Sequence, residues 1–173
     1  MKKLLFVLMF LSTGAFANSS YFGLSLAEVN YSDDTDNFIL PSFFARIGTE
    51  FTDVISGEIR YGYGVSDDYT TVNEEKLDQE MKGFYGAYLK VGYPLNDKVS
   101  PYYIIGLTRA ETVKTNILGE TLTVSETDNS MGFGADISIS NSSYFNIEYM
   151  TYIDRNTANA ETRGLSLGIV SKF

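Results

Sequence analysis

Carboxylates and arginines recur at alternate positions of several short stretches, and these residues could in principle do chemistry. Glu58 and Glu148 could form a carboxylate pair of the kind found in glycosidases and aspartic proteases. Arg46 and Arg60 share the face of their stretches with these acids, which favours ion pairs instead. The chain has no histidine and no cysteine, so the usual general base, disulfides and the commonest zinc ligands are absent. We expect no enzyme, no cofactor and no metal site.

The stretches that carry these charges alternate apolar and polar residues, which predicts β-strands with two unlike faces. Strands are expected at residues 20–31, 42–51, 55–65, 83–93, 101–110, 130–139, 144–153 and 163–173. Pro41 lacks a backbone N–H, so regular pairing of the second strand is expected to start at Ser42. Short connections near Asp53, Asp97 and Ser142 alternate with long ones near Asp34, Glu75, Gly119 and Asn159. The pattern predicts an all-β fold, an eight-stranded antiparallel up-and-down transmembrane β-barrel.

The two faces of these strands indicate which side meets lipid. One parity is apolar along the strands and aromatic near their ends, as in Phe22, Tyr63 and Phe145. In the seventh strand the apolar parity continues through Tyr149 to Ile153. Aromatic rings that flank an aliphatic band are typical of a membrane barrel, whereas a soluble lipocalin-like barrel would turn its charges outward. The other parity is rich in glycine and predicts a charge network in the lumen: Arg46, Glu50, Glu58, Arg60, Lys90, Asp136, Glu148 and Lys172.

The N-terminus predicts export. Lys2 and Lys3 precede a short apolar run, and Ala15 and Ala17 form an A-x-A cleavage signal. We expect residues 1–17 to be a cleaved signal peptide and residues 18–173 to be a single barrel domain. Without the two lysines, 11 basic residues face 22 acidic ones, a net charge of −11 that disfavours nucleic acid as a partner.

The final strand ends on an aromatic residue, with Leu165, Leu167, Ile169 and Phe173 on one parity. The chain from residue 18 to residue 173 resembles the outer-membrane β-barrel domain family, the small eight-stranded barrels of the OmpA/OmpX type. The resemblance implies an integral protein of the bacterial outer membrane with extracellular long loops, surrounded by lipid and lipopolysaccharide. It also implies that Phe173 and its strand form the signal read by the barrel-assembly machinery. We expect a monomer.

Two functions are compatible with such a barrel. We favour a structural or surface-interaction role, in which ion pairs fill the narrow lumen and the acidic loops meet any partner. The alternative is a narrow porin-like channel for ions or small solutes. Tyr69 and Arg155 are the candidate loop contacts, because aromatic and arginine anchors dominate binding surfaces. The acidic run at residues 33–36 could hold a divalent cation, although a solvated anionic rim is the favoured interpretation.

Overall fold

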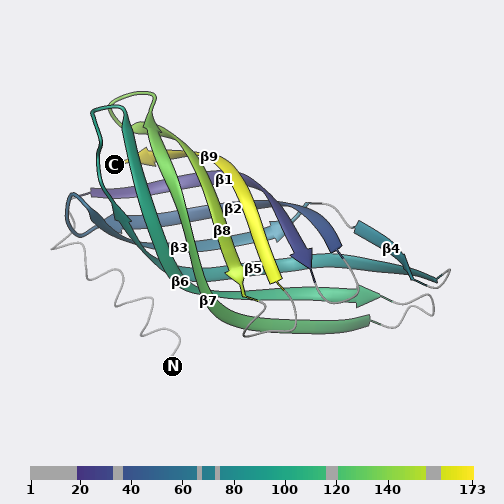
Figure 1. The fold of residues 1–173 in the computed structure, drawn as a ribbon. Coiled ribbons are helices and arrows are strands. Elements are labelled where there is room, and N and C mark those ends of the chain that lie inside the picture. Colours follow the sequence, from purple (N-terminus) through teal and green to yellow (C-terminus); the bar gives the residue numbers. More distant parts are fainter. Residues whose placement is uncertain (1–18, 33–36, 66–67, 73–74, 116–120, 155–160) are drawn as a thin grey trace.

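The computed structural model describes residues 19–32, 37–65, 68–72, 75–115, 121–154 and 161–173, and in these ranges all regular structure is β-strand. The strands are β1 (Ser19–Ser32), β2 (Asn37–Glu50), β3 (Ile55–Gly64), β4 (Asp68–Val72), β5 (Glu75–Gly92), β6 (Val99–Thr115), β7 (Thr121–Ser138), β8 (Ser143–Ile153) and β9 (Glu161–Lys172). Pairing of β1 with β9 and of β3 with β5 closes a ring of eight antiparallel strands. The predicted up-and-down barrel is confirmed. The remaining strand, β4, pairs only with β5 and lies outside the ring (Figure 1).

The two ends of the barrel differ. At the end that we call the turn end, residues 51–54, 93–98 and 139–142 connect β2 to β3, β5 to β6 and β7 to β8. The turns are tight, since Phe51 N donates to Ile55 O at 2.9 Å and Ile139 N donates to Ser143 O at 2.9 Å. Phe173 lies at this end, where its N–H donates to Ser20 O at 2.8 Å. The opposite end, which we call the loop end, carries the remaining connections and β4 (Figure 1).

The apolar parity faces outward, as its pattern predicts. Leu26 is 66% exposed and Phe133 is 63% exposed, although both are large and apolar. Ile153 is an exception to the prediction, because it is 1% exposed and faces inward. The pairing of β8 with β9 shifts between Thr151 and Ile153. A register shift of this kind adds a residue to one strand and exchanges the faces beyond it.

Pro41 does not delay β2, so the predicted start at Ser42 is wrong. The strand pairs with β1 from Ser32↔Asn37 onward, and Pro41 lies opposite Glu28 without a break in register. The carbonyl of Pro41 accepts a hydrogen bond from Val65 N at 2.8 Å, on the side of β3. In an antiparallel strand the N and C=O of one residue point to the same side. The missing N–H therefore faces the place where β3 ends, and the pairing with β1 loses nothing.

The segments predicted as the second and third long loops are largely β-structure. β4 pairs with residues 75–79, residues 78–81 pair with residues 112–115, and residues 111–115 pair with residues 121–125. The pairing of β7 with β8 begins only at Met131, and that of β3 with β5 reaches only Gly62↔Phe84. Residues 68–72, 75–81, 111–115 and 121–129 therefore form a four-stranded sheet beyond the barrel, which we call the extension (Figure 1).

Part of the sequence-based prediction lies outside the described residues: the signal peptide with Ala15 and Ala17, the acidic run at residues 33–36, and Arg155. Tyr69 lies in β4, where the backbone is described and the side chain is not. Within the described part of the chain, no helix has the length and apolarity needed to cross a membrane.

Candidate functional site in the barrel interior

Four charged side chains meet at the centre of the barrel, and we call them the central cluster: Arg46, Glu58, Arg60 and Glu148. Arg60 forms ion pairs with both acids and holds Glu148 in a two-point contact, in which Nη2 donates to Oε2 at 2.7 Å. Arg46 Nη1 lies 3.9 Å from Glu58 and 3.7 Å from Glu148. All four side chains are fully buried. Buried charges of this kind need partners, because the cost of desolvating them is several kcal/mol each.

Hydroxyl and amide groups complete the coordination of the central cluster. Tyr102 donates to Glu148 Oε2 at 2.7 Å, and Tyr21 donates to Glu58 Oε2 at 3.0 Å. Asn146 Nδ2 donates to the Tyr102 hydroxyl at 2.8 Å and to Asp136 Oδ1 at 2.6 Å. These bonds link the cluster continuously to the charges nearer the turn end.

The other four predicted lumen charges form two ion pairs toward the turn end. Lys90 Nζ lies 2.5 Å from Asp136 Oδ2, and Lys172 Nζ lies 2.6 Å from Glu50 Oε1. A cavity of about 170 Å³ opens beside them, and all four residues line it. We call this cavity the vestibule. The eight residues predicted to share the lumen thus form two groups, one fully buried and one bordering a cavity, which Tyr102 and Asn146 connect.

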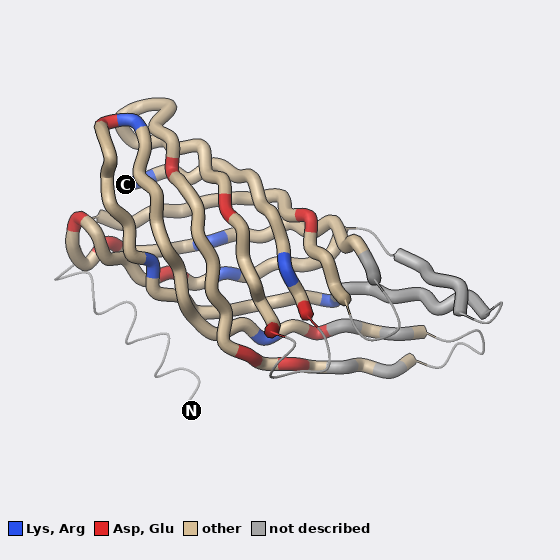
Figure 2. Tube along the Cα trace, in the orientation of Figure 1, with Lys and Arg blue, Asp and Glu red and all other residues tan. Residues whose placement is uncertain are grey.

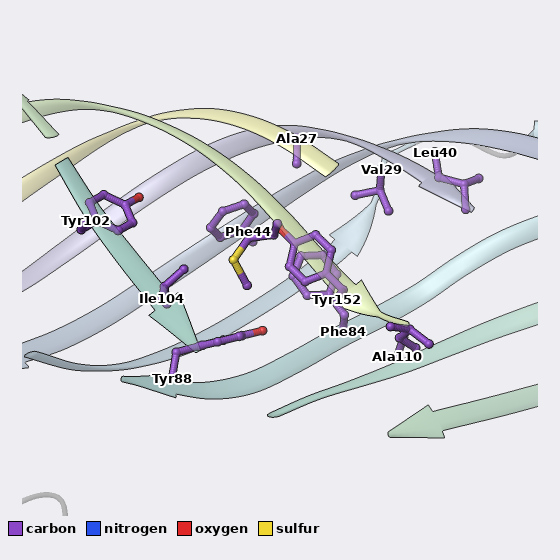
Figure 3. Packing of buried hydrophobic residues seen from close by; sticks show 12 residues of the cluster. Ala27, Val29, Leu40, Phe44, Phe84, Tyr88, Tyr102, Ile104, Ala110 and Tyr152 are labelled. Atoms are coloured by element: carbon purple, nitrogen blue, oxygen red, sulfur yellow. The ribbon is translucent and has the colours of Figure 1, made fainter. Parts of the chain in front are cut away.

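Toward the loop end the interior is apolar. Phe44 packs against Phe84 with ring centroids 5.9 Å apart, and Phe84 packs against Tyr152 at 5.4 Å. Figure 3 shows these rings meeting in the middle of the lumen, with Val29 and Leu40 beyond them. The Phe44 ring also borders the central cluster, since the guanidinium carbons of Arg46 and Arg60 lie 4.9 and 5.2 Å from its centroid. The sequence analysis did not identify this layer. A signal was present, because Phe44, Phe84 and Tyr152 are all large aromatic residues on the charged parity of their strands.

A second chain of hydrogen bonds crosses four strands, β5 to β8, beside the central cluster. The Tyr88 hydroxyl lies 2.7 Å from Thr108 Oγ1, which lies 2.6 Å from Ser130 Oγ, and Ser130 donates to the Tyr152 carbonyl oxygen at 2.8 Å. The Tyr88 ring also stacks against Arg60, whose guanidinium carbon lies 4.8 Å from the ring centroid. Tyr88 and Thr108 stand on the glycine-rich parity of their strands, and their pattern predicted no role for them.

The arrangement of the interior favours ion pairing over catalysis. Glu58 and Glu148 both contact Arg60, and neither carboxylate is exposed, so neither has the access to substrate that a general acid or base requires. Among the described residues there is no group of three or more His, Cys, Asp and Glu arranged to hold a metal ion. Over the barrel, Lys and Arg are interspersed with Asp and Glu (Figure 2).

The predicted assembly residues of β9 lie on the lipid-facing side. Leu165, Leu167, Ile169 and Phe173 are all exposed, and Ile169 pairs with Leu24 of β1 and Phe145 of β8. The outward wall around them is continuously apolar, as a surface that contacts acyl chains must be.

Comparison with known proteins identifies the fold family. The chain matches the outer membrane protein beta-barrel domain over residues 4–173. It belongs to this family. The chain is therefore an integral β-barrel of the bacterial outer membrane, as the sequence resemblance indicated.

Solved structures of other members share the barrel. Ail, the attachment invasion locus protein of Yersinia pestis, in complex with the heparin analogue sucrose octasulfate, is 15% identical, with 90% of this chain and 98% of Ail covered and a TM-score of 0.67. Neisserial surface protein A is 17% identical, with 89% and 97% covered and a TM-score of 0.68. The N-terminal barrel of Pseudomonas aeruginosa OprF is 12% identical, with 87% and 97% covered and a TM-score of 0.59. No curated protein matches the sequence. Identities of 12–17% show a shared fold alone.

Proposed function

We propose that this outer-membrane barrel has a structural and surface-interaction role, is not an enzyme, and does not conduct solutes. The short turns face the periplasm and the extension faces outward from the cell, because small outer-membrane barrels have short periplasmic turns and longer extracellular connections. The observation that carries the proposal is the extension itself. It presents four paired strands beyond the barrel, where a partner can reach them without entering the membrane.

The interior supports a role that does not require transport. The Phe44, Phe84 and Tyr152 layer and the central cluster lie one after the other along the lumen, and their side chains are almost completely buried. A solute would have to separate both layers. We expect no steady nanosiemens-scale openings when the purified protein is placed in planar lipid bilayers, and such openings would favour the channel alternative.

The charge of the extension indicates the kind of partner. Residues 66–80 contain six acidic residues and one lysine, and residues 111–128 contain four acidic residues and one lysine. Net charges of −5 and −3 repel polyanions and attract cationic surfaces within about 10 Å at moderate salt. We therefore propose a cationic protein surface as the partner, in contrast to the sulfated sugar bound by Ail.

Replacing the extension tests the proposal. One variant replaces residues 65–81, and a second replaces residues 112–124, each with a short Gly/Ser turn. Both cuts leave the barrel pairings from Gly62↔Phe84 and Met131↔Thr151 intact. A third variant replaces residues 156–160, which leaves Arg155 in place, as the control. Cells displaying each protein are tested for adhesion to polylysine-coated and heparin-coated surfaces, and folding is measured separately by circular dichroism.

We expect the parent and the control variant to adhere to polylysine in a salt-sensitive way, and the two extension variants to fold but to adhere much less. Equal adhesion by all four proteins would place recognition elsewhere and refute the role of the extension. Stronger adhesion of the parent to heparin than to polylysine would refute the proposal that the partner is positively charged.

A further inference from the structure

The vestibule at the turn end is lined by one polar side chain from each of the eight barrel strands. In order around the barrel these are Lys172, Tyr21, Glu50, Ser56, Lys90, Tyr102, Asp136 and Tyr144, from β9, β1, β2, β3, β5, β6, β7 and β8. The charges alternate in sign around the barrel, and a tyrosine or serine residue stands between each charge and the next. These eight residues together are neutral, and Asp53 of the adjoining turn also lines the cavity.

The ion pairs of this ring do not use all the N–H donors of its two lysines. Each lysine ammonium has three N–H donors, and its carboxylate partner takes one of them. Both ammonium groups also lie over tyrosine rings, with Lys90 Nζ 3.9 Å from the Tyr102 centroid and Lys172 Nζ 4.9 Å from the Tyr144 centroid. Such rings hold an ammonium group through their electron-rich faces.

The ring is open to a ligand, in contrast to the central cluster. The side chains of Lys90 and Asp136 are 11% and 16% exposed, and those of Lys172 and Glu50 are 33% and 24% exposed, whereas the four side chains of the central cluster are 0% exposed. The cavity volume of about 170 Å³ equals roughly five or six water molecules at about 30 Å³ each. That space suits a solute or headgroup of the size of a small amino acid.

We propose that the vestibule binds a small zwitterion with a primary ammonium group and a carboxylate or phosphate. A neutral ring gives little net attraction to a simple cation or anion, because each charge of one sign is flanked by charges of the other. A ligand that carries both charges can place its anion on the donors of Lys90 or Lys172 and its ammonium on Glu50 or Asp136. A free amino acid and a phosphoethanolamine headgroup share this chemistry.

The test uses the full mature chain, refolded in detergent micelles and labelled at its tyrosines for NMR. Glycine and phosphoethanolamine are the zwitterionic probes, and acetate and methylammonium are the two halves of glycine. We expect saturable shifts of the Tyr102 and Tyr144 signals with the zwitterions, at dissociation constants at least tenfold lower than with either half. Tighter binding of glycine would indicate a free solute, and tighter binding of phosphoethanolamine would indicate a lipid headgroup.

Paired neutral substitutions locate the site. K90Q/D136N and K172Q/E50Q each remove one ion pair while keeping the ring neutral, and each is expected to weaken zwitterion binding at least tenfold. The second pair lies at the more exposed rim, so it serves if the first variant fails to fold. R109Q/E111Q removes an exposed ion pair, with Arg109 Nε and Glu111 Oε1 3.7 Å apart, from outside the vestibule and should bind like the parent.

Three results would overturn the proposal: the absence of saturable shifts with either zwitterion, equal responses to acetate, methylammonium and glycine, or unchanged binding by a folded ring variant. In each case, the charged residues of the ring would only pair with one another and would not bind a zwitterion.

Discussion

Replacing Arg60 with methionine tests whether the central cluster holds the barrel together. Arg60 contacts Glu58 and Glu148 and packs against Tyr88, and its side chain is fully buried. Methionine keeps most of the apolar contact and removes the charge. The two glutamates would then share Arg46, whose Nη1 lies 3.9 and 3.7 Å from them, and the cluster would carry one uncompensated negative charge.

The expected cost follows from the burial of that charge. Removal of one partner of a buried ion pair costs about 3–5 kcal/mol, because the other partner stays desolvated and unpaired. This range corresponds to a change of more than about 100-fold in the unfolding equilibrium. The double variant R60M/E148Q restores neutrality, with Arg46 facing Glu58 alone. We expect it to lose less than half as much free energy of unfolding as R60M does.

The measurement is urea unfolding of the refolded chain in lipid vesicles, followed by far-UV circular dichroism, since the chain contains no tryptophan to report by fluorescence. R109M is the control, because Arg109 forms an exposed pair with Glu111 that should contribute no more than about 1 kcal/mol. If R60M is no less stable than R109M, or if the double variant is less stable than R60M, the central cluster does not stabilise the barrel in the way described.

Two further predictions concern the wall of the barrel. Deletion of Phe173 removes its two backbone hydrogen bonds with Ser20 and the aromatic side chain that follows β9. We therefore expect less folded protein in the outer-membrane fraction when the variant and the parent are synthesised at equal levels. Equal recovery would contradict a role of this residue in assembly. Gly106→Ala is expected to cost about 1–3 kcal/mol in urea unfolding, because its Cβ would lie 2.2 Å from the Ala87 backbone oxygen. Gly92→Ala, whose Cβ would have no neighbour nearer than 3.6 Å, is the matched control, and equal losses would refute the steric explanation.

The faces of the barrel were predictable because membrane and lumen impose opposite chemistry on alternate residues. Arg46, Arg60 and Glu148 are charges on a glycine-rich parity, and that alone places them inside. Their grouping was not predictable. Arg60 and Glu148 are 88 residues apart in the sequence. They meet because the strands of the closed barrel are staggered, and the size of this stagger cannot be read from the periodicity of the sequence.

The sequence-based prediction was wrong where backbone pairing between strands, and not burial of an apolar face, produces the structure. Residues 121–129 have only two apolar members, Leu122 and Val124, so they are typical of a loop, yet their backbone pairs with β6. A strand in water has no need of an apolar face if a neighbouring strand satisfies its N–H and C=O groups. Ile153 was misplaced for a related reason, because a local register shift leaves no mark in the composition of β8.

The length of the extension is independent of the part of the barrel that crosses the membrane. Its hairpins are continuous with β5, β6 and β7, but their outer pairings involve none of the strands on the opposite wall. Adding one residue to each arm of a hairpin would lengthen it by about 3.4 Å and leave the register of the spanning part unchanged. Two residues per arm would preserve which side chains face each side. Such insertions would therefore change how far the extension stands out from the barrel in small, even steps, without altering the strands that cross the membrane.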